Sequence, residues 1–269
     1  MRRTFVLFTV LASLLCTLPA ALASESVAYS KSFIRGVPVH IITVNLNARN
    51  IVVTPAIARH GIGTAEGFGS MLSRLKPCAA ITGTYFCVKS LIPVGDIVVS
   101  GKRLNSGDIR TVACFNPQSG VAFRPVRELR KSHTETYPFA LASGPRLVTY
   151  GVPGVYPHDE GFRDSHLYMK ARRSALGVTK QNKLLLVTVD RPIYLSKLAW
   201  IMRELGAYHA INLDGGSSTA LHYKGRSICH PGRSMTNLVV VYDSASQFAS
   251  AKSELAPSCN ESSTAKPHS

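Results

Sequence analysis

The sequence predicts a mixed α/β (α+β) fold: a single domain with a mixed β-sheet core, a few flanking helices and one βαβ crossover. The chain has 269 residues, of which 45% are hydrophobic and 17% charged, so it can bury a substantial core. Most of its apolar runs are short and rich in β-branched residues, as in strands. The stretch 183–214 reads as strand, helix and strand in succession, which favours a right-handed crossover between parallel strands.

The first residues have the pattern of a secretory signal peptide. Arg2 and Arg3 precede the apolar run 5–18, and Ala-Leu-Ala at 21–23 fits the rule for a cleavage site. We therefore predict a signal peptide over 1–23 and a secreted or periplasmic protein, with an uncleaved anchor as the alternative. No later apolar run is long enough to cross a bilayer, so we expect no stable membrane insertion.

The N-terminal half reads as successive strands with one short helix. Residues 24–74 are assigned to the N-terminal strands of the domain, and a helix over 66–75 is ended by Pro77. Charged, irregular sequence at 125–137 and 149–171 indicates surface loops. The strands are expected at 37–46, 51–57, 79–86 and 97–100, with a hairpin over 110–124.

The second half carries the βαβ unit of the main domain region, 75–243. A turn at Gln181-Asn182 is expected to join two strands and to place Arg173 opposite Asp190. The apolar run 184–187 indicates a strand buried on both faces. Apolar residues at helical spacing predict a helix over 194–206 that ends at a glycine, and 209–214 is the next strand. After a last strand at 235–243, Ser/Ala/Lys-rich sequence predicts a flexible tail over 244–269.

The expected crossover brings scarce acidic residues to one sheet edge. Asp190 and Asp214 would end two parallel strands at the edge where such units bind ligands. Arg173 could hold a phosphate there, although a structural ion pair between Arg173 and Asp190 is an alternative. Two glycines after Asp214 let the backbone approach a ligand closely, and with the hydroxyls that follow they suggest an anion-binding turn, or simply a tight turn. This turn comprises Gly215, Gly216, Ser217 and Ser218.

The charge balance narrows the class of partner. The formal net charge is +16, yet no interleaved aromatic stripe accompanies it, so we expect an anionic phosphoglycan and no nucleic acid. No metal-binding or cofactor-binding motif occurs, and Asp164-Ser165-His166 is expected to be solvated surface, so no cofactor or metal is predicted. An exported chain could form disulfides, whose pairing the sequence does not give. The cysteines left after signal cleavage are Cys78, Cys87, Cys114, Cys229 and Cys259.

Several ordered blocks resemble the phosphodiester glycosidase family. The main ones are 173–177, 184–190 and 212–218 with Thr236-Asn237, preceded by 80–86, 93–95 and 143–147, so the resemblance covers roughly 75–243. It implies an exported glycosidase that hydrolyses a sugar-1-phosphodiester in envelope or exopolysaccharide glycans. It also implies Asp214 as the main catalytic carboxylate, Asp190 as its partner and Arg173 as the phosphate clamp. Substrate contacts are then expected from the 215–218 turn and from Thr82, Tyr85 and Asn237.

The chain departs from the family pattern at two places. Thr82-Gly83-Thr84-Tyr85-Phe86 stands where the family has Asn-Gly-Gly-Tyr-Phe, and Asp190-Arg191-Pro192 stands where it has Asp-Gly-Arg. The first change replaces an amide by a shorter hydroxyl. A non-catalytic phosphoglycan-binding protein on the same fold is therefore the second hypothesis. A serine hydrolase with Ser217 as nucleophile and His222 as base is the third.

Overall fold

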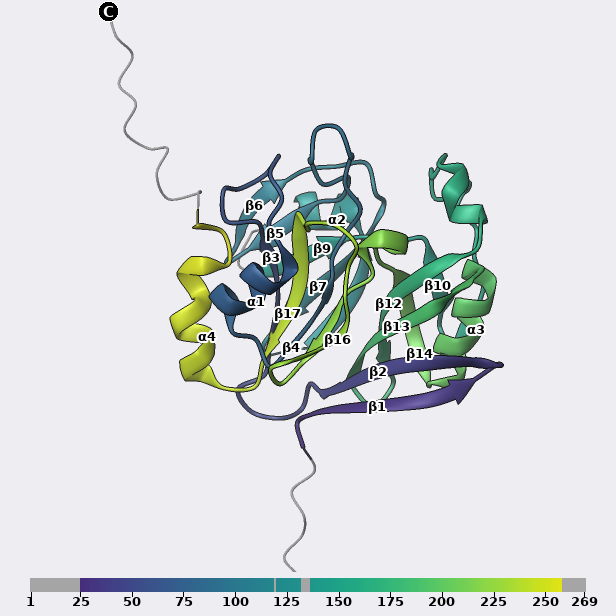
Figure 1. Ribbon diagram of the computed structural model, residues 1–269, viewed down its shortest axis with the longest axis horizontal. Coiled ribbons are helices and arrows are strands. Elements are labelled where there is room, and N and C mark those ends of the chain that lie inside the picture. The colour runs from purple at the N-terminus through teal and green to yellow at the C-terminus, as the bar shows by residue number, and fades with distance from the viewer. Residues whose placement is uncertain (1–24, 119, 132–135, 258–269) are drawn as a thin grey trace, which may run out of the picture.

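The computed structural model describes residues 25–118, 120–131 and 136–257, and they form a strand-dominated mixed fold built on three antiparallel sheets (Figure 1). The seven-stranded sheet has the order β1-β2-β13-β12-β14-β10-β11. Its strands are β1 (Val27–Ile34), β2 (Val37–Asn45), β13 (Lys183–Ile193), β12 (Ala171–Thr179), β14 (Ala207–Asn212), β10 (Arg146–Thr149) and β11 (Val152–Pro153).

Two five-stranded sheets complete the strand framework. The second sheet, β16-β15-β4-β17-β3, comprises β16 (Arg226–Cys229), β15 (Leu221–Tyr223), β4 (Ala79–Thr82), β17 (Asn237–Tyr242) and β3 (Val52–Ile57). The third sheet, β6-β5-β9-β7-β8, comprises β6 (Lys102–Asn105), β5 (Ile97–Val99), β9 (Phe139–Ala142), β7 (Thr111–Asn116) and β8 (Gly120–Pro125).

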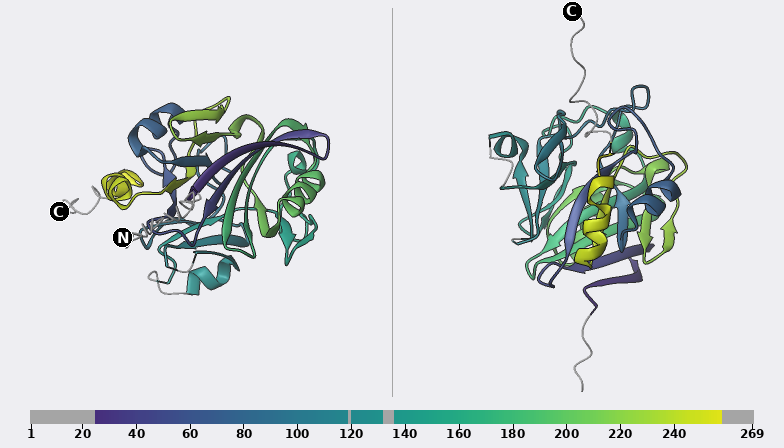
Figure 2. Two further views of the ribbon diagram at one scale, coloured as in Figure 1. Left: turned by 90° about the horizontal axis from the view of Figure 1, so that it is seen from below. Right: turned by 90° about the vertical axis from the view of Figure 1, so that its left-hand side faces the viewer.

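The helices are short and lie outside the sheets. They are α1 (Phe68–Leu75), α2 (Val126–Lys131), α3 (Leu195–Glu204) and α4 (Ala245–Ala251), with 3₁₀ turns η1 (Ser165–Tyr168), η2 (Gly216–Ser218) and η3 (Lys252–Glu254). Helices α3 and α4 lie at opposite ends of the molecule (Figure 2). None of the helices among the described residues is long and apolar enough to cross a membrane.

Side chains of the central strand β13 are buried on both faces of the seven-stranded sheet. Leu184 and Leu186 of β13 join the main core between the three sheets, whereas Leu185 and Val187 pack with α3 on the other face. This confirms the burial expected from the continuous apolar run 184–187. The central strand β13 is therefore packed between two parts of the core, one on each face of the sheet.

Helix α3 connects β13 to β14, as expected, but β12 lies between these two strands and pairs antiparallel with both. β13 and β14 therefore run parallel without pairing, and the expected βαβ crossover of an α/β sheet is not confirmed. All strand pairings among the described residues are antiparallel. The α/β class is corrected accordingly, because the tight β12–β13 hairpin fills the position next to β13 and leaves β14 the other edge of β12.

The expected register of that hairpin is wrong by one residue. Arg173 pairs with Val189, not with Asp190. The turn contains three residues instead of two, because Asn182 adopts a left-handed conformation (φ 57°) while its amide donates to the Thr179 carbonyl at 3.2 Å. A one-residue slip reverses the face on which a side chain lies, so Arg173 and Asp190 point to opposite faces of the sheet.

Two segments expected to be irregular have defined structure. Residues 126–131 form α2, and 245–254, expected within a flexible tail, form α4 and η3. Leu255 is fully buried and its carbonyl accepts from Ile57 N at 2.9 Å. Tertiary contact therefore holds this C-terminal segment against the second sheet. The predicted signal peptide and the last residues, 258–269, lie outside the described part of the chain.

The four described cysteines, Cys78, Cys87, Cys114 and Cys229, are free thiols. Cys87 is exposed, and the other three are buried. No disulfide joins these four, and Cys259, the fifth cysteine considered for a disulfide, lies outside the described residues.

Candidate active site

A cavity of about 670 Å³ lies at the end of the seven-stranded sheet, where loops from both halves of the sequence converge. Tyr85 and its neighbours, which follow β4, form one wall. Residues 162–171, expected only as a surface loop, form another. Arg173 of β12 and the turn that begins at Asp214 complete it, and Arg233 contributes from the loop between β16 and β17.

Asp214 is a nearly buried carboxylate in this cavity. It follows β14, and its backbone amide donates to the Gly83 carbonyl at 3.0 Å, which fixes the turn against β4. One carboxylate oxygen accepts from the Gly215 amide at 2.8 Å, and the other faces Arg233 Nη2 at 3.2 Å. Burial raises the pKa of the Asp214 carboxyl above its ordinary value, although Arg233 opposes this shift. A buried carboxyl held in this way is a candidate for proton transfer to or from a bound substrate.

Arg173 is a buried guanidinium without a carboxylate partner among the described residues. Its side chain bonds only to backbone carbonyls, with Nε 3.3 Å from Ile193 O and Nη2 3.3 Å from Leu167 O. No hydrogen-bond partner is found for Nη1 in the described part of the chain. Burial lowers the pKa of Arg173, because the surroundings do not compensate its charge fully. Such a group is prepared to bind an anion that enters the cavity.

Some residues of the turn after Asp214 line the cavity, and others hold neighbouring side chains in position. Gly215, Gly216 and Ser217 line the cavity, and Gly216 has a positive φ of 56°. The Gly215 amide already bonds Asp214, so this donor serves the carboxylate. Ser218 is buried, and its hydroxyl accepts from Arg233 Nε at 2.6 Å. Of the four expected contacts, Ser218 is therefore placed as a support for Arg233.

Of the three remaining expected substrate contacts, Tyr85 lines the cavity, whereas Thr82 and Asn237 do not. Tyr85 lines the cavity, and its hydroxyl donates to Gly144 O at 2.6 Å and accepts from Asn212. Thr82 is fully buried at the end of β4, and its hydroxyl has no hydrogen-bond partner among the described residues. Asn237 is buried beneath the loop, where its side-chain oxygen accepts from Thr84 N at 2.7 Å. Asn237 thus shapes the wall that carries Tyr85 and does not line the cavity itself.

Gly83 is required by this packing. A β-carbon at position 83 would lie 1.9 Å from Oδ1 of Asn237, the same oxygen that binds the Thr84 amide. We expect Gly83→Ala to lower the free energy of unfolding by about 1–3 kcal/mol, the usual effect of overpacking. Urea denaturation measures this change. Gly69→Ala in α1 is the control, since a β-carbon there has nothing within 4 Å and should stabilise the helix. A Gly83→Ala variant as stable as the control variant would contradict the argument.

The structure does not bring Asp190 to the cavity. Its carboxylate bonds Arg172 Nη2 at 2.7 Å and faces the second sheet, on the opposite side of β13 from Arg173. The expectation that Asp190 and Asp214 share one site assumed that Asp190 ends its strand, whereas β13 continues to Ile193 and the Asp190 carboxylate faces His40 and Cys229. The ion pair considered between Arg173 and Asp190 is instead made by the neighbouring Arg172.

Two features of the cavity were missed in the sequence. Arg233 pairs with Asp214, and its guanidinium carbon lies 4.4 Å from the centre of the Phe86 ring. It sits in a loop without a motif, and no sequence signal indicates its partner. Asp164 and His166, expected on solvated surface, are exposed but line the cavity mouth and form a 2.7 Å pair. Their spacing gave no indication of this position.

Comparison with known proteins agrees with the resemblance seen in the sequence. Residues 76–242 match the family model described as phosphodiester glycosidase. The chain belongs to the phosphodiester glycosidase family. No curated protein matches the chain. The matched span includes Asp214, Arg173, Arg233 and Tyr85, so the cavity is built largely from the family region.

Solved structures share the fold of this phosphodiester glycosidase family member. A hypothetical protein from Synechocystis is 17% identical to this chain, with a TM-score of 0.72. The match covers 81% of this chain and 62% of the Synechocystis chain, so this chain spans less than two thirds of that protein's length. The catalytic domain of zebrafish N-acetylglucosamine-1-phosphodiester α-N-acetylglucosaminidase, auto-inhibited by its pro-peptide, has 18% identity, a TM-score of 0.65 and coverages of 82% and 85%. A Burkholderia pseudomallei protein named as exported has 13% identity, a TM-score of 0.60 and coverages of 77% and 74%.

Proposed function

We propose that this protein hydrolyses a sugar-1-phosphodiester to a free reducing sugar and a phosphomonoester. The observation that carries the proposal is that Asp214 and Arg173 line the same cavity. Asp214 is a buried carboxylate, and Arg173 is a guanidinium that has no acidic partner among residues 25–118, 120–131 and 136–257. A negative phosphate and an electron-poor anomeric carbon are the two substrate features that this pair can recognise. Membership of the family and the zebrafish enzyme's named activity support the same reaction class.

In the proposed reaction Arg173 holds the phosphate and Asp214 acts as the base. Water forms a new bond to the anomeric carbon while its proton passes to the Asp214 carboxylate. The bond between that carbon and the phosphate-bridging oxygen breaks, and the electron pair remains on the phosphate. The leaving phosphomonoester is a weak base, so it needs little protonation, and Arg173 stabilises its charge. Arg233 holds Asp214 in position and favours its ionised form.

The site of action follows from the predicted signal peptide and from the charge. We propose that the protein is exported to the periplasm or secreted and acts on envelope or exopolysaccharide glycans. The net charge of +16 falls to +14 once Arg2 and Arg3 are removed with the signal peptide (16 − 2 = 14), and this charge attracts polyanionic material of this kind at long range. Raising the ionic strength should therefore slow substrate capture more than the chemical step.

Release of reducing sugar tests the proposal directly. Purified protein is incubated with N-acetylglucosamine-1-phosphodiesters and with other sugar-1-phosphodiesters, and both reducing sugar and phosphomonoester are measured. Equal molar release of the two products is expected. Release of the alcohol with sugar-1-phosphate would mean cleavage on the other side of the phosphorus, which would contradict the proposed reaction.

A non-catalytic phosphoglycan-binding protein is the second candidate. It is favoured by Thr82, a buried hydroxyl where the family has an amide, and by the absence of Asp190 from the cavity. It predicts saturable binding of the same phosphodiesters without product release, and binding that Arg173→Gln abolishes. Calorimetric titration beside the product assay separates the two functions.

The pH profile provides a further prediction. Asp214 must be ionised to accept a proton, and burial raises its pKa, so kcat/KM should fall with decreasing pH at values above the ordinary aspartate range. Arg233 lowers the pKa of Asp214, so Arg233→Gln should move this acid limb to still higher pH. The measurement is kcat/KM against pH for both proteins. An acid limb that stays in place in Arg233→Gln would contradict the role of Asp214 as base.

A further inference from the structure

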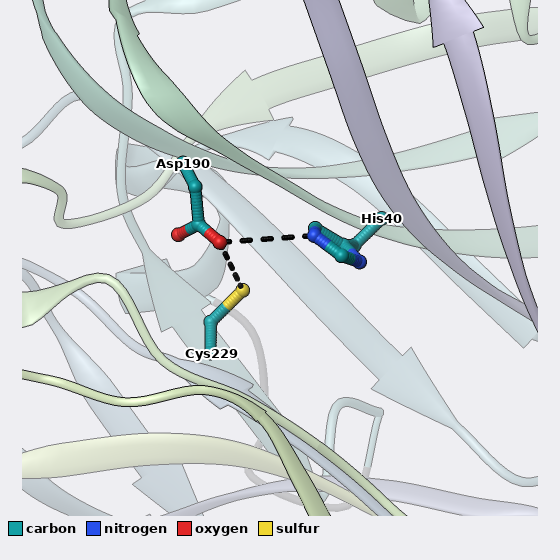
Figure 3. A group of neighbouring side chains, drawn as sticks. All are labelled: His40, Asp190 and Cys229. Atoms are coloured by element: carbon teal, nitrogen blue, oxygen red, sulfur yellow. Dashed lines mark hydrogen bonds and ion pairs between the residues drawn. The ribbon is translucent and has the colours of Figure 1, made fainter.

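His40, Asp190 and Cys229 meet at a second polar site, away from the cavity (Figure 3). They come from β2, β13 and the end of β16, so the site joins the seven-stranded sheet to the second sheet. His40 Nε2 lies 3.7 Å from Asp190 Oδ2, and Cys229 Sγ lies 3.4 Å from the same oxygen. One carboxylate oxygen thus faces both an imidazole nitrogen and a thiol sulfur.

We propose that His40, Asp190 and Cys229 form a binding site for a divalent transition metal of the zinc type. Imidazole nitrogen, carboxylate oxygen and thiolate sulfur are the three ligand types that zinc prefers. None of the proposed chemistry in the Asp214 cavity depends on this site. The metal site would use three residues that have no role in the proposed reaction.

The spacing of the ligand atoms fits a tetrahedral metal site. Usual zinc–ligand lengths place neighbouring ligand atoms about 3.3–3.6 Å apart in a tetrahedron. The two distances to Asp190 Oδ2, 3.7 Å from His40 Nε2 and 3.4 Å from Cys229 Sγ, are close to these values. All three ligand atoms lie within 4.8 Å of one another, so His40 and Cys229 need only move slightly closer to bind one ion. The His40–Asp190 distance is too long for a direct hydrogen bond, whereas a metal ion can bridge it.

Each proposed ligand is also held by a partner from outside. Tyr29 Oη lies 2.9 Å from His40 Nδ1, which leaves Nε2 free to face the site. Arg172 binds only Oδ1 of Asp190, at 2.7 Å for Nη2, and so leaves Oδ2 for a metal. The Thr188 hydroxyl lies 3.1 Å from Cys229 Sγ. Outer contacts that orient the ligating atoms in this way are typical of metal sites.

Access and charge are compatible with binding. The Cys229 side is closed, whereas the Asp190 side chain is 39% exposed and provides the route from solvent. When the ion binds, a metal–sulfur bond forms and the thiol proton of Cys229 passes to solvent. The carboxylate and the thiolate then offset the charge of a divalent ion, and the Arg172 guanidinium on Asp190 Oδ1 leaves the group with one net positive charge. Three protein ligands leave one tetrahedral position for water or another small ligand.

Cobalt titration of the purified, chelator-treated protein tests the proposal. We expect one equivalent of Co²⁺ to produce a thiolate-to-cobalt charge-transfer band and the visible bands of a tetrahedral ion, and Zn²⁺ to displace it. Cys229→Ser should remove the charge-transfer band, and His40→Ala should weaken binding at least tenfold. Cys87→Ser is the matched control, because Cys87 is the exposed free thiol of the described chain, and it should leave the band unchanged.

Two further measurements keep the test decisive. Tyr29→Phe keeps all three ligands but removes the contact to His40 Nδ1, so it should lower Co²⁺ affinity about tenfold. This variant tests the site even if Cys229→Ser does not fold. Zn²⁺ should raise the melting temperature of the unaltered protein, because the ion ties two sheets together. No charge-transfer band in the unaltered protein, or a band that persists in Cys229→Ser, would overturn the proposal.

Discussion

Asp214→Asn should lower kcat/KM for a sugar-1-phosphodiester by about 10²–10⁴-fold, the usual contribution of a positioned acid–base group. The amide has nearly the size of the carboxyl but cannot take a proton from the attacking water. Its single oxygen can accept either from Arg233 or from the Gly215 amide, whereas the native carboxylate accepts from both, so the variant loses one of the two hydrogen bonds. The measurement is initial release of reducing sugar by the variant and the unaltered protein under the same conditions.

The loss should come from chemistry and not from unfolding. Burial already disfavours the charged form of Asp214, as its raised pKa indicates, so a neutral amide imposes no new desolvation cost. The melting temperature of Asp214→Asn should therefore not fall much. Asp159→Asn is the matched control, because its side chain is 78% exposed and lies outside the cavity. Activity that survives Asp214→Asn but disappears in Ser217→Ala would favour the serine hydrolase hypothesis instead.

Local sequence patterns were sufficient for most of the secondary structure. The apolar spacing at 195–205 predicts a helix, and α3 covers Leu195–Glu204 with Gly206 at positive φ. The strands β2 and β3 also lie where β-branched residues predict them. Helix α4 was missed because its sequence is Ser/Ala-rich, and it gains stability from contacts such as that between Phe248 and Phe139, which local sequence does not contain.

Strand order and register were harder, and the site depends on them. One extra residue in the turn at Asn182 decides whether Arg172 or Arg173 meets Asp190. The motif at 214–218 identified one side of the cavity, because glycines after a strand are a strong local signal. Arg233 and the cluster of His40, Asp190 and Cys229 had no such signal. Their contacts join residues far apart in the sequence, and only the pairing of the sheets brings them together.

Arg173→Gln should lower kcat/KM by about 10²–10³-fold, the usual effect of removing a donor that stabilises developing charge. Arg173 is the buried cation of the cavity and has no acidic partner in the described chain, whereas Lys170 is exposed and Arg233 is already paired with Asp214. Loss of its charge removes the buried cation that faces the departing phosphate, in a site where water screens poorly. Arg173→Lys should recover part of the activity, since it restores the charge but not the planar fork.

Inhibition by inorganic phosphate separates the clamp from a purely structural role. If Arg173 binds the phosphate group, Arg173→Gln should raise the phosphate inhibition constant at least tenfold, and Arg173→Lys should raise it less. A structural role predicts lower stability with an unchanged inhibition constant, because the Arg173 side chain also holds the carbonyls of Leu167 and Ile193. Arg203 is an exposed arginine on α3, so Arg203→Gln is the matched control. It should leave both kcat/KM and the phosphate inhibition constant unaltered. The clamp is therefore wrong if phosphate inhibits Arg173→Gln and the unaltered protein equally.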